Sequence, residues 1–191
     1  MPEKTLSSLG LTPRYGGDFS VRGLALDSRS TQAGELFGDL PPGTGLVITA
    51  EPRAALARAA ALWYGAQPEH VVAVTGTNGK TSIASFTRQI WTELGYEAAS
   101  IGTIGVEGAY SAPGIHTTPD PLTLHRLLAD MAEAGVTHVA MQASSHGLDQ
   151  NRLDGVALSA AAFSNLTQDH LDYHGSMEAY GDAKAGLFLL P

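Results

Sequence analysis

The feature that most constrains the fold of this chain is a short apolar run that leads directly into a glycine-rich loop. Val71–Val74 is continuously apolar, as strands buried on both faces of a parallel sheet usually are. The loop Thr75–Thr81 follows, and apolar residues at helical spacing come after it. These are Ile83, Phe86, Ile90 and Leu94, and Gly95 ends the pattern. The order of strand, loop and helix predicts the first half of a βαβ unit.

The chain continues this alternation to its last residues. Further strands are expected at Ala98–Ile104, Thr137–Met141 and Leu158–Asn165, with helices from Pro121 to before Gly135 and over Ser176–Leu189. Strands joined through helices form parallel sheets that are covered by those helices. The sequence therefore predicts an α/β fold, in which residues 68–191 form a partial P-loop-type parallel sheet of about four strands with flanking helices.

Residues 1–67 are predicted to form a small N-terminal α/β domain. Val21–Leu26 and Leu46–Thr49 are expected as short strands, and Pro41–Gly45 is a strong turn or linker signal. Pro52 stands where a first helical residue belongs, and an alanine-rich run follows it up to Gly65. A helix is therefore predicted at Pro52–Tyr64.

Composition excludes several classes of function. The chain has no cysteine, which rules out disulfides and thiolate chemistry and permits a reducing cytoplasm. Its formal charge is −8 and its lysines and arginines form no cluster, so nucleic acid is not an expected partner. No apolar run is long enough to cross a membrane, and the N-terminus lacks the pattern of a secretory signal.

The glycine-rich loop has the chemistry of an anion cradle. Backbone N–H groups of the loop and of the helix that follows would face the phosphates of a nucleotide. Gly76 and Gly79 let the backbone approach, Lys80 would reach the β- and γ-phosphates, and the Thr81 hydroxyl would bind Mg²⁺. The loop is a compact G-x-x-G-K-T form, because Val74 stands where the common pattern has another glycine. The alternative is a glycine-rich turn with a solvated lysine.

Several ordered segments resemble the Mur ligase family. They are Leu26–Arg29, Thr75–Ser82, His116–Asp120, Ser144–Leu148 with Gln150 and Arg152, and Asn165–Gly175 followed by Tyr180 and Ala183–Ala185. Together they resemble the branch that adds the third residue, usually meso-diaminopimelate or lysine, to UDP-N-acetylmuramoyl-L-alanyl-D-glutamate. The resemblance implies an ATP-dependent amide ligase of peptidoglycan synthesis that works through an acyl-phosphate. It also implies a cytoplasmic location and, for full-length family members, a monomer.

The resemblance implies a role for each matching residue. ATP phosphates would be bound by Gly76, Thr77, Asn78, Gly79, Lys80, Thr81 and Ser82. The catalytic residues would be Lys80, His170 and Lys184. Magnesium would be held by Thr81, Gln142, His170 and Lys184, the last as a carbamate, whose oxygens suit a hard cation. The UDP-sugar-peptide and its carboxylates would be held by Leu26, Ser28, Thr117, Thr118, Ser144, Gln150 and Arg152.

Simpler interpretations of these residues remain open. Lys184 could be an ordinary solvated lysine on a polar helix face, and Asp169-His170 could be a turn that caps a strand end. Ser144–His146 suggests a serine hydrolase only superficially, because adjacent residues do not supply base and orienting group. His70, His125 and His138 have no motif around them and are expected to be surface or packing residues.

The sequence departs from the family pattern in three places. Gln142 stands where the family usually has a glutamate that helps to hold Mg²⁺, so metal affinity should be lower. The chain passes quickly from Phe37 into Pro41–Gly45, which implies a shortened UDP-sugar-binding domain in residues 1–67. The ATP-binding domain in residues 68–191 would be truncated and the C-terminal ligase domain absent, so these residues alone are expected to show little or no ligase turnover.

Two other functions are compatible with the sequence. One is a related ATP-dependent ligase of the folylpolyglutamate or cyanophycin synthetase type, which shares the phosphate loop and the metal-binding lysine. The other is a non-catalytic remnant that binds ATP or a UDP-sugar.

Overall fold

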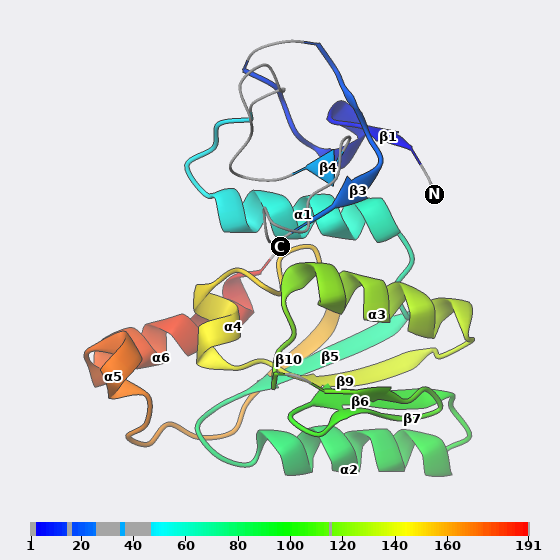
Figure 1. Ribbon diagram of the computed structural model, residues 1–191. Coiled ribbons are helices and arrows are strands. Elements are labelled where there is room, and N and C mark those ends of the chain that lie inside the picture. The colour runs from blue at the N-terminus through cyan, green and yellow to red at the C-terminus, as the bar shows by residue number, and fades with distance from the viewer. Residues whose placement is uncertain (1–2, 15–16, 26–34, 37–46, 115, 191) are drawn as a thin grey trace.

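A computed structural model of the chain describes residues 3–14, 17–25, 35–36, 47–114 and 116–190. In these residues a twisted sheet lies between α2, Lys80–Glu93, on one face and α3, Pro121–Glu133, on the other (Figure 1). Helix α1, Pro52–Tyr64, packs on the outer side of α3 and carries the N-terminal strands. The α/β fold expected from the sequence is confirmed, and the helix at Pro52–Tyr64 has the predicted bounds.

The sheet is mostly parallel, in the order β10-β5-β9-β6-β7-β8. Its strands are β5 (His70–Thr75), β6 (Ala98–Gly102), β7 (Gly105–Gly108), β8 (Ala112–Pro113), β9 (His138–Gln142) and β10 (Leu158–Phe163). The carboxyl ends of β10, β5, β9 and β6 lie at one edge, because these four strands run parallel. The prediction of about four strands is wrong, since β7 and β8 add an antiparallel extension to β6.

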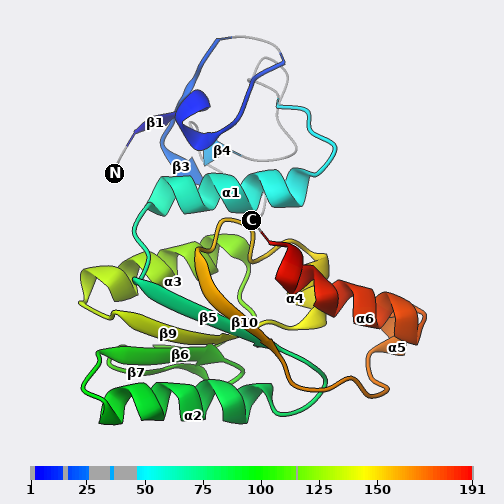
Figure 2. The same cartoon turned by 180° about the vertical axis from the view of Figure 1, so that it is seen from behind.

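The remaining helices gather beyond the carboxyl ends of the strands. They are α4 (Ser145–Asp149), α5 (Leu171–His174) and α6 (Met177–Ala185), followed by a 3₁₀ turn at Gly186–Leu189. Figure 2 shows β10 beside β5, with the chain running from β10 to α5 and α6. The predicted helix over Ser176–Leu189 is therefore a shorter α-helix, capped by the Ser176 hydroxyl, and a tighter final turn.

The described residues of the N-terminal segment form four two-residue strands. They are β1 (Lys4–Thr5), β2 (Ser20–Val21), β3 (Gly23–Leu24) and β4 (Glu35–Leu36), with a 3₁₀ turn at Ser7–Leu9. The expected strand at Val21–Leu26 is interrupted between β2 and β3, which belong to different sheets. The strand expected at Leu46–Thr49 is wrong for Val47–Thr49, because these residues pair with none of the described strands. The buried contact between this segment and α1 is formed by Leu9 and Val21 of the segment and by Trp63 of the helix.

Helix α3 supplies much of the main core. Its apolar residues at helical spacing are buried: Leu124, Leu128 and Met131 are each 0% exposed. They pack against β5, β6 and β9 in one cluster. The helix begins at Pro121 because Asp120 caps it, its carboxylate accepting from the N–H of Thr123 at 3.0 Å.

Replacing Leu128 with alanine is expected to lower the free energy of unfolding by about 2–5 kcal/mol. The side chain is fully buried, so its removal loses contacts and leaves a cavity. Urea unfolding followed by circular dichroism measures the change. Leu189→Ala is the matched control, because Leu189 is 83% exposed and its loss should change stability by about 0.5 kcal/mol or less. Equal stability of the two variants would contradict the position of α3 over the sheet.

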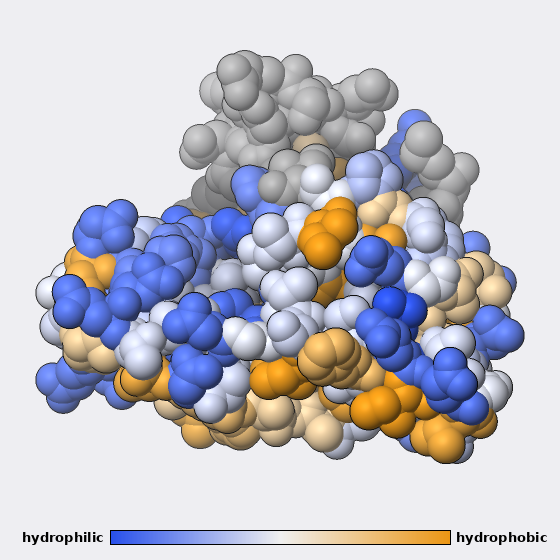
Figure 3. All heavy atoms as spheres, turned by 90° about the horizontal axis from the view of Figure 1, so that it is seen from below, coloured by the Kyte–Doolittle hydropathy of each residue, from blue (hydrophilic) through white to orange (hydrophobic). Residues whose placement is uncertain are grey.

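Helix α2 buries less of its predicted stripe than the pattern suggests. Phe86, Ile90 and Leu94 are 60%, 59% and 67% exposed, while Ala84 is buried against Val74 and Ala140. A groove of about 200 Å³ lies between α2 and strands β5, β9 and β10, with Ile83 on its wall. Figure 3 shows hydrophobic side chains on the side of the molecule where α2 lies. Within the described ranges, no element covers this face.

None of the helices in the described part of the chain has the length and apolar character needed to cross a membrane.

Candidate active site

The glycine-rich loop joins β5 to α2 in a conformation that its two glycines permit. Gly76 has φ +130° and Gly79 has φ +88°, both in the region that favours glycine. A Cβ on Gly76 would lie 2.0 Å from the Ser164 hydroxyl oxygen, so this position also lacks space for a side chain. Gly79 caps α2, whose first internal hydrogen bond runs from Ile83 N–H to Gly79 C=O. The preceding N–H groups at this helix end remain available to an anion.

Residues that follow β10 hold the loop in place. Asn165 accepts the N–H of Thr77 through its backbone at 2.8 Å and the N–H of Asn78 through its side chain at 3.1 Å. Its amide nitrogen and the Ser164 hydroxyl both donate to the Asn78 carbonyl, at 3.0 and 2.7 Å. The sequence prediction included Asn165 in a motif but did not identify it as a site residue. The signal in the sequence was its position at the end of a predicted strand, Leu158–Asn165.

Two lysines that are distant in sequence converge on one loop carbonyl. The Lys80 ammonium donates to the carbonyls of Gly76 and Thr77, both at 2.8 Å. The Lys184 ammonium, on α6, also donates to Gly76 C=O at 2.8 Å. Lys184 is 1% exposed, so the interpretation of it as a solvated lysine is wrong. The structure therefore joins two of the three predicted catalytic residues at the mouth of the loop.

The proximity of two ammonium groups in a partly buried site affects their protonation. Burial and, to a smaller extent, the Lys80 charge lower the pKa of Lys184 to about 8, while Asp169 opposes the shift. Burial also lowers the pKa of Lys80, against the opposing effect of Asp169. At pH 7 the Lys184 side chain would be a neutral amine in roughly a tenth of the molecules. An exposed lysine is neutral in a far smaller fraction.

Thr81 and Gln142 are adjacent, as the predicted metal position requires. The Thr81 hydroxyl donates to Gln142 Oε1 at 3.1 Å. Gln142 is 3% exposed and lies against Gly102, where a Cβ would come within 1.9 Å of Gln142 Nε2. Both potential oxygen ligands are neutral. Among the described residues, no group of three or more His, Asp or Glu side chains has the arrangement of a metal site.

His170 belongs to a group of rings next to the lysines. It has φ +52° and is the N-cap residue of α5, whereas the simpler interpretation placed a turn at the end of a strand. Its ring lies 4.9 Å from the ring of His146 and 6.2 Å from that of Tyr180, measured between centroids. Tyr180 in turn has the Lys184 ammonium 4.5 Å above its ring. Burial lowers the pKa of His146, and nearby His170, His174 and Arg152 lower it further. Lys80, Lys184 and His170 thus share one neighbourhood.

Four of the residues predicted to hold the UDP-sugar-peptide form one hydrogen-bonded network. Thr118 Oγ1 donates to Gln142 C=O and accepts the N–H of Ser144, both at 2.9 Å. Arg152 donates to Thr118 C=O at 2.7 Å and to Gln150 Oε1 at 2.7 and 3.1 Å. The guanidinium therefore contacts neutral oxygens here, with no carboxylate among these contacts. The Ser144 hydroxyl caps α4 by accepting the N–H of Gly147, which is a structural role rather than that of a hydrolase nucleophile.

The other predicted residues lie apart from this network or outside the described residues. Thr117 pairs with Thr103 through their hydroxyls at 2.9 Å. Leu26 and Ser28 lie outside the described residues. The histidines without motifs behave as packing residues: His125 Nε2 lies 2.9 Å from the Asp154 carbonyl, and His138 packs between aromatic rings.

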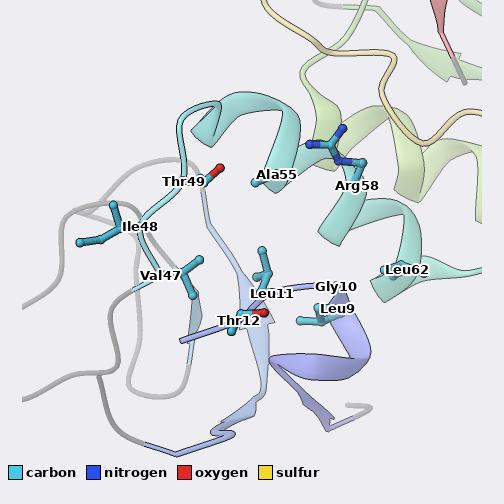
Figure 4. A pocket seen from close by; sticks show the side chains of 10 residues that line it. All are labelled: Leu9, Gly10, Leu11, Thr12, Val47, Ile48, Thr49, Ala55, Arg58 and Leu62. Atoms are coloured by element: carbon cyan, nitrogen blue, oxygen red, sulfur yellow. The ribbon is translucent and has the colours of Figure 1, made fainter. Parts of the chain in front are cut away.

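A separate cavity of about 330 Å³ lies in the N-terminal part of the molecule (Figure 4). It is bounded by residues 9–12, by residues 47–49 and by Ala55, Arg58 and Leu62 of α1. Its wall is mainly apolar, and its arginine, Arg58, pairs with Asp154 at 3.5 Å. The phosphate loop is not part of its lining.

The fold and the site define the class of this protein as an α/β protein with a P-loop-type phosphate-binding loop at the carboxyl edge of its sheet. The signature of the Mur ligase middle domain matches residues 74–190. The chain belongs to the Mur ligase family.

Similar proteins are consistent with this family. The chain is 48% identical, over 95% of its length, to UDP-N-acetylmuramoyl-L-alanyl-D-glutamate–2,6-diaminopimelate ligase of Brucella melitensis biotype 1. A solved structure of a ligase with that name has a TM-score of 0.80 and 28% identity over 98% of this chain and 45% of its own. Escherichia coli FolC, solved with ADP, has a TM-score of 0.57 and 19% identity over 71% of this chain and 38% of its own, which is a likeness of fold. The chain spans 44% of the Brucella ligase.

Proposed function

We propose that this chain carries the nucleotide-phosphate part of the active site of an ATP-dependent ligase that joins diaminopimelate to UDP-N-acetylmuramoyl-L-alanyl-D-glutamate. The observation that carries the proposal is the convergence of Lys80 and Lys184 on the Gly76 carbonyl, next to the N-terminus of α2. The Lys80 ammonium and the N-terminus of a fourteen-residue helix concentrate positive potential at this loop. The names of the similar ligases support diaminopimelate, rather than lysine, as the added residue.

The loop residues would bind the phosphates of ATP. Gly76–Ser82 would present backbone N–H groups, and Lys80 would exchange its two carbonyl contacts for phosphate oxygens, to which charge-assisted hydrogen bonds are stronger. Proteins accelerate phosphoryl transfer mainly by positioning the transferred phosphoryl group and by stabilising its negative charge. The role of Lys80 is therefore to neutralise developing negative charge.

The proposed magnesium ligands fit the ion only in part. Thr81 and Gln142 offer oxygens at one point, and His170 lies near Lys184 across the ring of Tyr180. Hard cations bind through oxygen and gain most from anionic oxygens. Most of the negative charge would therefore have to come from the nucleotide and from Lys184 as a carbamate. The lowered pKa of Lys184, which leaves part of its amine neutral, supports that modification.

The network around Thr118 would orient the second substrate. Arg152 and Gln150 are partly accessible and could contact a carboxylate or a phosphate, whereas Thr118 is 1% exposed and would act by fixing Ser144. Thr117, Leu26 and Ser28 complete the proposed binding set. The proposal also places the protein in the cytoplasm, with small-molecule partners and no nucleic acid, and treats it as a monomer.

Titration calorimetry of the 191-residue chain tests the proposal. Separate titrations use Mg-ATP, UDP-N-acetylmuramoyl-L-alanyl-D-glutamate and a folate. Binding of Mg-ATP and of the UDP-dipeptide, without binding of the folate, is the expected result. Preference for the folate would favour a folylpolyglutamate synthetase type of ligase, whose fold FolC shares. Binding of Mg-ATP alone would favour a non-catalytic nucleotide-binding remnant. Binding of none of the three ligands would contradict all three functions.

Replacing Gln142 with glutamate is expected to strengthen Mg²⁺ binding in the nucleotide complex by about tenfold. The new carboxylate keeps the contact with Thr81 and adds a charge, although burying it offsets part of an attraction on the order of 4 kcal/mol. Mg²⁺ titration at fixed ATP measures the effect. Gln89→Glu, on the exposed side of α2, is the matched control with the same change in charge. An unchanged metal affinity would contradict the assignment of Gln142 as a ligand.

A further inference from the structure

Tyr180 touches both the phosphate loop and the lysine that faces it. It lies on α6, one helical turn before Lys184, and is 1% exposed. Its hydroxyl donates to the Thr77 hydroxyl oxygen at 3.2 Å, and its ring lies 4.5 Å below the Lys184 ammonium. A single buried side chain thus connects Thr77 of the loop to the helix that carries Lys184.

The Thr77 hydroxyl has no capacity for another partner. It donates its one hydrogen to Thr167 C=O at 3.0 Å, and its oxygen accepts the N–H of Thr167 at 3.0 Å and the hydroxyl of Tyr180. A hydroxyl offers one donor and two acceptor positions, so all three are used. Loss of the Tyr180 hydroxyl would leave one of the two acceptor positions of this buried oxygen unused, which destabilises the loop at Thr77.

The position of Thr77 determines where the lysines can act. The Thr77 carbonyl accepts from Lys80, and the neighbouring Gly76 carbonyl accepts from both Lys80 and Lys184. A shift of Thr77 away from α6 would therefore separate the two ammonium groups that face the loop. On the other side of the same residue, the Thr77 N–H donates to the Asn165 carbonyl. The loop is therefore held between the residues that follow β10 and helix α6.

We infer that Tyr180 is a positioning residue: through its hydroxyl on Thr77 and its ring against Lys184, it holds the phosphate loop in register with α6 for nucleotide binding. This inference rests on the proposed function. Tyr180 does not touch the phosphates itself, and it acts by keeping the loop carbonyls and the two lysines aligned. A ring that served only to fill space would act equally well as phenylalanine.

Nucleotide affinity and amide exchange are measured on the full chain for Tyr180→Phe, Thr77→Val and the double variant. Tyr180→Phe is expected to weaken Mg-ATP binding by about fivefold to tenfold, the effect of one buried hydrogen bond. The double variant should bind no more weakly than Thr77→Val alone, because both changes remove the same bond. Hydrogen exchange at the Thr77 and Asn78 amides should quicken by a similar factor in Tyr180→Phe, while exchange in α3 stays constant.

Tyr96→Phe is the matched control, because the Tyr96 ring packs on His138 far from the loop. Full nucleotide affinity with unchanged loop exchange in Tyr180→Phe would overturn the inference. It would also be overturned if the loss of Mg-ATP affinity in the double variant equalled the product of the losses in the two single variants. If the wild-type chain binds no nucleotide while loop exchange still quickens in Tyr180→Phe, the positioning of the loop stands and the proposed function fails. A lower thermal midpoint without either change would mark Tyr180 as structural only and would also overturn the inference.

Discussion

Replacing Lys80 with methionine should weaken Mg-ATP binding by about 100-fold. The ammonium would make charge-assisted hydrogen bonds to phosphate oxygens, worth about 1.5–3 kcal/mol each net of water, and methionine of similar length makes none. The fold itself should remain intact, because burial already disfavours this charge and lowers its pKa. Calorimetric titration with Mg-ATP, together with a thermal melt, separates the two effects.

Arg126→Met provides the matched control for the change in net charge. Arg126 lies on α3 and is exposed, so its loss should leave nucleotide affinity within about twofold. If Lys80→Met and Arg126→Met weakened binding equally, general electrostatic attraction would explain the affinity. The loop would then not be the phosphate site.

Replacing Gly76 with alanine should lower the free energy of unfolding by about 3 kcal/mol and abolish measurable nucleotide binding. Two costs combine at this position. Its φ of +130° is one that side chains rarely adopt, and the new Cβ would lie 2.0 Å from Ser164 Oγ and 3.0 Å from the backbone of Asn165. The loop would have to move away from β10 to relieve the contact. Urea unfolding and Mg-ATP titration measure the two losses.

Two further variants show whether the crowding at Gly76 is the cause. Gly186→Ala should change stability by about 0.5 kcal/mol or less, because a Cβ there meets nothing within 4 Å. Adding Ser164→Ala to Gly76→Ala removes the oxygen in closest contact and should recover part of the lost stability. A Gly76→Ala protein with normal stability and affinity would show that the loop does not have the described conformation.

The parts of the site that are local in sequence could be predicted. Strand β5, the loop and helix α2 are consecutive, and their hydrophobic spacing and glycines indicate each boundary within one or two residues. Helix α3 was predictable for the same reason, since Pro121 and the capping Asp120 mark its start.

The burial of Lys184 could not be derived from its local sequence. Its neighbours on α6 are alanine, glycine and aspartate, which are typical of a solvated helix face. The lysine is buried because α6 packs against α4 and against the loop, where Lys184 contacts Gly76 across 108 positions of sequence. The resemblance to a family suggested its role, while the carbonyl that it contacts is visible only in the structure.

The antiparallel extension of the sheet was missed for a physical reason. Strands β7 and β8 are four and two residues long, and Gly105 and Gly108 within β7 have φ of +122° and +119°. In a sequence, closely spaced glycines such as these indicate a turn. The two strands are also too short to show the alternation of apolar and polar residues that predicts a strand. The Cβ-free positions allow the chain to lie close to Ala98 and to residues 112–114.

The loop-holding role of Asn165 also depends on non-local pairing. Its sequence neighbours show that a strand ends there, but only the sheet order shows that β10 lies beside β5. Its side chain then reaches Asn78 across 87 positions of sequence. Polar residues that follow predicted parallel strands can therefore be treated as one candidate site even before the order of the strands in the sheet is known.

Nuclear relaxation caused by Mn²⁺-ATP would locate the nucleotide and its metal in the chain. The paramagnetic ion broadens the signals of nearby nuclei when it substitutes for Mg²⁺. The proposed site predicts that the amides of Thr81 and His170 and the side chain of Lys184 lose intensity first. If these signals stay sharp while those around the N-terminal cavity, such as Leu11 and Thr49, broaden, the nucleotide binds elsewhere and the proposed phosphate site is wrong.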